Sequence, residues 1–204
     1  DMDSLAEDAI ALLEALEISK CHLVGLSMGG YVAQRVALKR PDLLHSLILL
    51  DTGAEAENPE KKADYKKMLR AIHWLGIKRI SKKVMPIMFG ETFLNDKSRK
   101  QEYKTWLEHL RQNNKKGAMR ATAGVIERDG VLSRLPDINL PTLIVVGDED
   151  KPTPYEEAQK MHFAIKGSKL AVIKQAGHST PVEQPERLNQ VMSTFLKIVN
   201  TQSN

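Results

Sequence analysis

A serine between glycines lies where a short apolar run ends and a helical pattern begins. The run 22–26 predicts a buried strand, and residues 29–39 predict a helix. A strand that turns this sharply into a helix holds Ser27 in a strained backbone conformation with positive φ, and its hydroxyl stands clear of the sheet. We expect Gly25 and Gly29 to provide the space for this turn, because glycine has no Cβ.

Three more apolar runs and three more helical patterns extend the layout along the chain. The further strands are predicted at 46–51, within 141–150, and at 169–173. The further helices are predicted at 4–17 with a possible Ser4 cap, at 155–165 and at 185–199. Near-continuous apolar strands are typical of a parallel sheet that is covered on both faces. The alternation therefore predicts an α/β fold.

The stretch 54–138 interrupts this alternation, because it shows helical patterns and no convincing strand. A crossover between parallel strands needs only a dozen or so residues beyond its loops. Most of the stretch must therefore be an insertion. We expect an α/β core made of 1–53 and 139–204, with 54–138 as a helical cap. The insertion follows the carboxyl end of a strand, which is the edge where ligands of α/β proteins bind.

Charge and composition limit the classes of function. The 204 residues carry a net charge of +4, but the segment 61–104 holds 13 Lys and Arg against 4 Asp and Glu. Such a segment could bind nucleic acid, attract an anionic substrate or be a solvated helix face. Its lysines alternate with apolar residues at helical spacing and no RNA-stacking motif accompanies them, so we expect a solvated face and no nucleic-acid partner.

Targeting and cofactor signals are missing from the sequence. No apolar run approaches the length of a membrane span, and the acidic start "DMDSLAED" lacks the layout of a secretion signal. A single cysteine, Cys21, is typical of a reducing compartment. We therefore expect a cytoplasmic protein without a membrane partner. Neither metal-ligand spacing nor a dinucleotide fingerprint occurs, so we expect no metal and no organic cofactor.

A serine hydroxyl needs a base to become a nucleophile, and the base needs an orienting acid. Of the six histidines, His178 is the best placed, because it lies in a loop just after the strand 169–173. Loops at the carboxyl ends of parallel strands face the same crevice. Asp148, Glu149 and Asp150 all follow the third strand and are candidates for the acid. The resulting chain order is serine, acid, histidine.

With these residues in place, the chain resembles the α/β-hydrolase superfamily, and more narrowly the small bacterial serine esterases, the 3-oxoadipate enol-lactonase-like enzymes and the cofactor-free peroxidase-like hydrolases. The resemblance is carried by "HLVGLSMGGYVAQ", "LPTLIVVGDED" and "AGHSTPVEQPERL". It implies that Ser27 is the nucleophile, His178 the general base and Asp150 the acid, with Asp148 as a second choice. It also implies that the N–H of Met28 stabilises an oxyanion.

The resemblance implies cleavage of a carboxylic ester, a lactone or a related acyl bond through an acyl-enzyme. The substrate would be a small molecule held by residues at the crevice and in the cap, and the candidates are Thr52, Trp74, Met88, Phe89 and Trp106. A non-catalytic ligand-binding protein of the same fold, or an inactive fragment, is the alternative.

The chain also departs from the family. Family members normally carry a further segment before a stretch such as "DMDSLAED", and that segment supplies the first strands and a second oxyanion donor. We therefore expect a fold that lacks the usual N-terminal strands and is a fragment, a swapped oligomer or a chain completed by a partner segment. The strand 22–26 would then be an edge that invites pairing. With Met28 as the sole donor, catalysis is expected to fall by about 10²–10³-fold.

Overall fold

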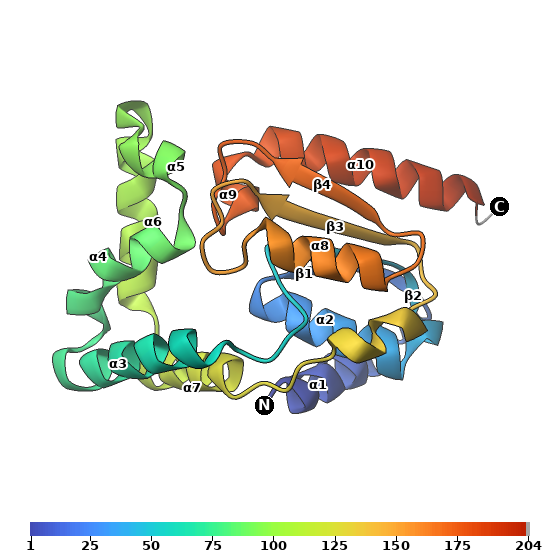
Figure 1. Cartoon of the computed structure of the whole chain (residues 1–204), viewed down its shortest axis with the longest axis horizontal. Helices are drawn as coiled ribbons and strands as arrows, with labels where there is room; N and C mark the ends of the chain where they lie inside the picture. Colours follow the sequence, from blue (N-terminus) through green and yellow to red (C-terminus); the bar gives the residue numbers. More distant parts are fainter. Residues whose placement is uncertain (203–204) are drawn as a thin grey trace.

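The computed structural model describes residues 1–202, and an all-parallel sheet forms its centre (Figure 1). Within these residues the sheet has four strands in the order β1-β2-β3-β4. Their bounds are β1 Cys21–Leu26, β2 Leu44–Leu50, β3 Thr142–Gly147 and β4 Lys169–Ile173. All four predicted strands are present, and their carboxyl ends lie at one edge of the sheet because neighbouring strands are parallel.

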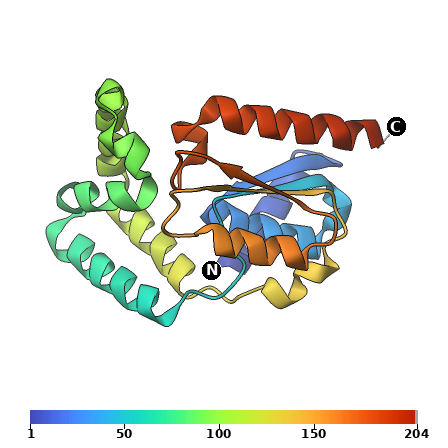
Figure 2. The same ribbon diagram turned by 45° about the horizontal axis from the view of Figure 1, so that its top comes forward.

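Helices cover both faces of the sheet, as the apolar strands predicted. One face carries α1 (Met2–Ala15), α2 (Met28–Lys39) and α8 (Tyr155–Ala164), and the other carries α10 (Pro185–Gln202) (Figures 1 and 2). The start of α1 differs from the prediction. Asp1 caps it by accepting the N–H of Ser4 at 2.8 Å, so Ser4 lies inside the first turn and does not cap the helix.

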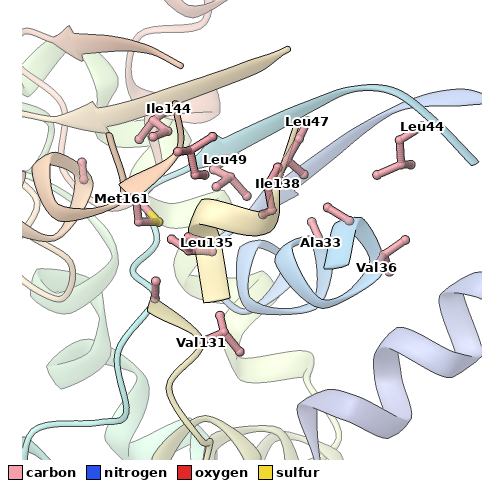
Figure 3. Close-up of a cluster of buried hydrophobic side chains, with 14 of the residues drawn as sticks. Ala33, Val36, Leu44, Leu47, Leu49, Val131, Leu135, Ile138, Ile144 and Met161 are labelled. Carbon is pink, nitrogen blue, oxygen red and sulfur yellow. The ribbon is translucent and has the colours of Figure 1, made fainter. Parts of the chain in front are cut away.

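Two hydrophobic cores lie against the two faces, because successive side chains of a strand point in opposite directions. Leu47 and Leu49 of β2 belong to the core beneath α2 and α8 (Figure 3). Ile48 and Leu50 of the same strand belong to the core beneath α10. The central strand β2 is therefore apolar at every one of these positions. This burial fixes the register of the sheet and holds the carboxyl ends of its strands in place.

A block of helices occupies most of the predicted insertion. Its members are α3 (Pro59–Leu75), α4 (Ile77–Met88), α5 (Glu91–Asn95), α6 (Lys100–Gln112) and α7 (Lys115–Ile126), with 3₁₀ helices at Lys97–Arg99 and Leu132–Asp137. The arrowheads of β3 and β4 point toward this block (Figure 1). The block has a core of its own, formed by Met85, Phe89, Phe93 and Leu107.

Two smaller elements complete the description. Pro41–Leu43 forms a single turn before β2, and α9 (Thr180–Glu183) lies between the loop after β4 and α10. Among residues 1–202, no helix is both long enough and apolar enough to cross a bilayer.

Candidate active site

Ser27 occupies the turn between β1 and α2 in a strained backbone conformation. Its φ is 51° and its ψ is −115°, which a non-glycine residue rarely adopts. Two hydrogen bonds hold the turn against the end of β2. The N–H of Ser27 donates to the carbonyl of Leu50 at 2.9 Å, and the hydroxyl of Thr52 donates to the carbonyl of Ser27 at 2.8 Å. The surrounding strands therefore impose the positive φ that the sequence predicted.

The glycines around Ser27 do not share the role that the sequence suggested. A Cβ at Gly25 would lie 2.4 Å from the carbonyl oxygen of Gly29, which backbone atoms do not permit. A Cβ at Gly30 would lie 2.5 Å from the Cγ2 of Thr52. A Cβ at Gly29 would meet no atom within 4 Å, so the prediction that Gly29 makes room for the turn is wrong. Gly25 and Gly30 are the positions that require glycine.

The loops after β1, β3 and β4 bring a hydroxyl, a carboxylate and an imidazole together. The Nε2 of His178 lies 2.6 Å from the Oγ of Ser27. The Nδ1 of the same ring lies 2.9 Å from Oδ2 and 3.1 Å from Oδ1 of Asp150. His178 and Asp150 are both buried. The three side chains therefore form one continuous hydrogen-bonded chain across residues far apart in the sequence.

The structure also separates the three acids that follow β3. Asp148 accepts the N–H of Gln175 at 2.7 Å, and Glu149 accepts the N–H of Thr92 at 2.9 Å. Of the three carboxylates, only that of Asp150 contacts the ring of His178.

Thr153 holds the carboxylate of Asp150 in place and was missed by sequence reasoning. Its N–H donates to Oδ1 of Asp150 at 2.9 Å, and its hydroxyl donates to Oδ2 at 2.8 Å. The same hydroxyl lies 3.2 Å from the Nδ1 of His178. A threonine three residues after an acid in a turn is a common capping pattern, so nothing in the amino-acid sequence distinguishes Thr153 from such a cap.

A cavity of about 220 Å³ adjoins Ser27 and His178. Helices α3, α4 and α7 contribute most of its wall, and its lining comprises Ser27, Met28, Tyr65, Met68, Val84, Ile87, Met88, Ala121, Thr122, Val125, Pro152 and His178. The amide of Met28 is the first of α2, where N–H groups lack an acceptor within the helix. The lining residues from α3 are Tyr65 and Met68, which lie on one face of that helix because they are three residues apart.

The predicted substrate-binding residues differ in where the structure places them: three line cavities, Thr52 is buried beneath the turn, and Trp74 is exposed. Met88 lines the Ser27 cavity, and it also lines a neighbouring cavity of about 220 Å³ together with Phe89 and Trp106. Thr52 is 1% exposed and lies beneath the turn, where it holds the carbonyl of Ser27, so the expectation that it faces the crevice is wrong.

Trp74 is also misplaced by the prediction, because it is 81% exposed and lines neither cavity. It lies six residues after Met68, about 240° further around α3, and so points away from the face that lines the cavity. Its ring packs edge-on against His73, with 5.2 Å between the ring centroids.

Asp51 is a buried carboxyl group that joins two of the loops at this edge. It follows β2 with a φ of 46° and is fully buried. Oδ1 accepts the N–H of Gly147 at 3.0 Å, while Oδ2 accepts the hydroxyl of Thr180 at 2.6 Å and its N–H at 3.2 Å. Burial raises the pKa of Asp51 from 3.8 to about 7; the hydroxyl of Thr180 opposes the rise, and the charge of nearby Asp150 adds to it.

This raised pKa predicts a pH-dependent stability. The folded protein binds the Asp51 proton more tightly than the unfolded chain does, so Asp51 makes the free energy of unfolding fall as the pH rises from about 4 to about 7. The slope it adds is at most about 1.4 kcal/mol per pH unit. An Asp51→Asn variant removes this contribution, so urea unfolding across that range should show the wild-type stability falling relative to the variant.

The exposed Asp64→Asn variant is the matched control and should follow the wild type at every pH. A constant difference in stability between the wild type and Asp51→Asn from pH 4 to pH 7 would contradict the raised pKa.

The loop that carries His178 is also tied to the helical block. Glu183 accepts the N–H of Gly90 at 2.8 Å and the N–H of Ser179 at 3.1 Å. The hydroxyl of Ser179 donates to the carbonyl of Met88 at 2.7 Å. A Cβ on Gly177 would lie 2.2 Å from the backbone nitrogen of Gly90, so the two backbones touch. The link between α4 and α5 therefore rests directly on the His178 loop.

Metal-binding side chains are not clustered in the part of the chain that the structure describes. Residues 1–202 contain no group of three or more His, Cys, Asp or Glu side chains arranged to hold a metal ion.

The fold and the hydrogen-bonded side chains at the carboxyl edge of the sheet define an α/β-hydrolase. The sequence profile of the alpha/beta hydrolase family matches residues 1–191, and the chain belongs to this family.

Known relatives agree with this assignment. A thermophilic esterase from Thermogutta terrifontis, solved with malate bound, is 33% identical with a TM-score of 0.87, and the match covers 97% of this chain and 72% of the esterase. A hydrolase structure from Pseudomonas aeruginosa is 26% identical with a TM-score of 0.85, over 96% of this chain and 71% of the other. The 3-oxoadipate enol-lactonase 2 of Acinetobacter baylyi is 28% identical over 98% of this chain and 72% of its own length.

Proposed function

We propose that the protein is a serine hydrolase that cleaves a carboxylic ester, a lactone or a related acyl bond. The observation that carries the proposal is the hydrogen-bonded chain from the Oγ of Ser27 through the ring of His178 to Asp150. Two known proteins support the acyl chemistry, because a structural relative is an esterase and a sequence relative is an enol-lactonase.

The reaction follows from the directions of these hydrogen bonds. With a proton on Nδ1 held by Asp150, the Nε2 of His178 accepts the hydroxyl proton of Ser27 while Oγ attacks the substrate carbonyl. The carbonyl oxygen becomes an oxyanion, and the N–H of Met28 at the start of α2 donates to it. His178 returns the proton to the leaving group, an acyl-enzyme remains, and water releases the acid by the same steps.

In this proposal the helical block 54–138 is the cap of the site, and the core is 1–53 with 139–204. Met88 forms a wall that the Ser27 cavity and its neighbour share, while Phe89 and Trp106 line the neighbour. A mostly apolar cavity with one nucleophile and one amide donor suits a small acyl group. The role of Thr153 is to fix the acid, and it touches no substrate.

A fluorophosphonate probe tests the proposal. The Oγ of Ser27 should displace fluoride and form a bond to phosphorus, which intact-protein mass spectrometry detects as a single adduct. Ser27→Ala should remove the adduct, whereas Ser193→Ala, at an exposed serine of α10, should retain it. Folded wild-type protein that never reacts would contradict the proposal and favour the alternative, a ligand-binding protein without turnover.

A further inference from the structure

A groove between α3 and α4 leads away from the Ser27 cavity. This α3–α4 groove encloses about 520 Å³ and is lined by Lys61, Asp64, Tyr65, Lys67, Met68, Ala71, Leu75, Ile80, Lys83, Pro86, Ile87, Lys151 and Pro152. Four of these residues also line the Ser27 cavity, namely Tyr65, Met68, Ile87 and Pro152. The two spaces are therefore neighbours, with these four residues bordering both of them.

Apolar side chains of α3 and α4 form much of the groove wall. Tyr65, Met68 and Leu75 lie on one face of α3, because their spacing is close to whole turns of a helix. Ile80 and Ile87 lie seven residues apart on the facing side of α4. A volume of this size with hydrocarbon walls suits a hydrocarbon chain of medium length.

Lysines add positive charge to these apolar walls. Lys67 pairs with Asp64 at 2.8 Å, and Lys151 pairs with Glu91 at 2.9 Å, so their charges are compensated. Lys61 donates to the carbonyl of Pro152 at 2.7 Å and forms no ion pair among the residues that the structure describes.

Lys83 is the second uncompensated charge, because within residues 1–202 it has neither an ion pair nor a side-chain hydrogen bond. Two lysines outside the groove behave differently. Lys62 and Lys66 both pair with Glu127, at 3.7 and 3.1 Å. Lys78 and Lys82 of α4 also lack an ion pair within residues 1–202, but they do not line the groove, whose own unpaired lysines are Lys61 and Lys83.

We propose that the α3–α4 groove binds the far end of an ester substrate whose apolar chain ends in an anionic group such as a carboxylate. The apolar walls hold the chain. Asp64, the carboxylate of the groove lining, pairs with Lys67, so the charges of Lys61 and Lys83 attract the anionic group of the substrate. The proposal rests on the function proposed above and adds the substrate class. It also accounts for the basic segment 61–104, whose unpaired charge lies partly at the entrance to the site.

Two esters of equal chain length test the substrate class. We expect the wild-type kcat/KM for mono-p-nitrophenyl suberate to exceed that for p-nitrophenyl octanoate by about four- to twentyfold at low salt. Lys61→Met and Lys83→Met should each lower this preference by about two- to fivefold, and added salt should lower it as well. Lys66→Met, which removes a paired charge from the same helix, should leave it unchanged.

Equal kcat/KM values for the two esters would overturn the groove proposal. A preference that is unchanged in both Lys61→Met and Lys83→Met would overturn it as well. Neither result would contradict the proposal that the protein is a serine hydrolase. If the protein hydrolyses neither ester, ligand binding provides a second test of the groove proposal. Ser27→Ala protein should bind monomethyl suberate more tightly than methyl octanoate in titration calorimetry, and Lys83→Met should remove most of the difference. Binding without this difference would overturn the groove proposal, whatever the outcome for hydrolysis.

Discussion

Replacing Ser27 with alanine is expected to lower kcat for p-nitrophenyl acetate by about 10⁴–10⁶-fold, because the proposed nucleophile is removed. His178→Ala should cause a loss of the same order, since the hydroxyl then lacks its proposed base. Asp150→Asn should cost about 10⁴-fold, because an amide does not hold the imidazole in the required tautomer. Stopped or discontinuous assays with purified, folded variants provide the measurement.

The combination of variants is more informative than any one of them. When two side chains act as one unit, removing the second causes no further loss of activity. The double variant with Ser27→Ala and His178→Ala should therefore have a kcat no lower than that of either single variant. The control is His45→Ala, which changes an exposed histidine outside the site and should retain wild-type kcat. Independent, multiplicative losses from Ser27→Ala and His178→Ala would show that the two side chains do not act through their shared hydrogen bond.

Gly25→Ala is expected to damage both the fold and the activity. Its new Cβ would lie 2.4 Å from the carbonyl oxygen of Gly29, so the turn at Ser27 must move. Overpacking of this kind costs about 1–3 kcal/mol, which corresponds to a fall in Tm of roughly 2–12 °C for a chain of this size. A displacement of Ser27 by about 1 Å is enough to lower activity about 10²-fold.

Gly29→Ala is the matched control, because its Cβ meets no atom within 4 Å and the residue lies in the first turn of α2. Its Tm should stay close to that of the wild type or rise, since alanine favours the helix over glycine by about 0.5–1 kcal/mol. Differential scanning calorimetry compares the two variants directly. If Gly29→Ala were the more damaging of the pair, the description of the turn would be wrong.

Much of the fold could be predicted because buried strands consist of consecutive apolar residues, which are visible in the sequence. The strands β2 and β3 are covered on both faces, so they appear as uninterrupted apolar runs, and β4 matches its predicted range without change. The order of these runs then places the loops after β3 and β4 at one edge of the sheet. This reasoning was enough to select His178, because it alone of the histidines follows a strand there.

The choice among neighbouring residues could not be made in the same way. Asp148, Glu149 and Asp150 are equivalent in pattern, and the geometry of the turn decides which carboxylate reaches the ring of His178. Trp74 was misjudged because residue type alone does not fix which side of α3 faces the site. The functional roles of the serine, the acid and the histidine remain predictions that the variants above will test.

The contact between Gly90 and Gly177 has a consequence for the position of the imidazole of His178. The link between α4 and α5 cannot lift away without disturbing the loop that carries the imidazole, since Glu183 holds both. A displacement of this link is therefore expected to move the imidazole of His178 away from the Oγ of Ser27.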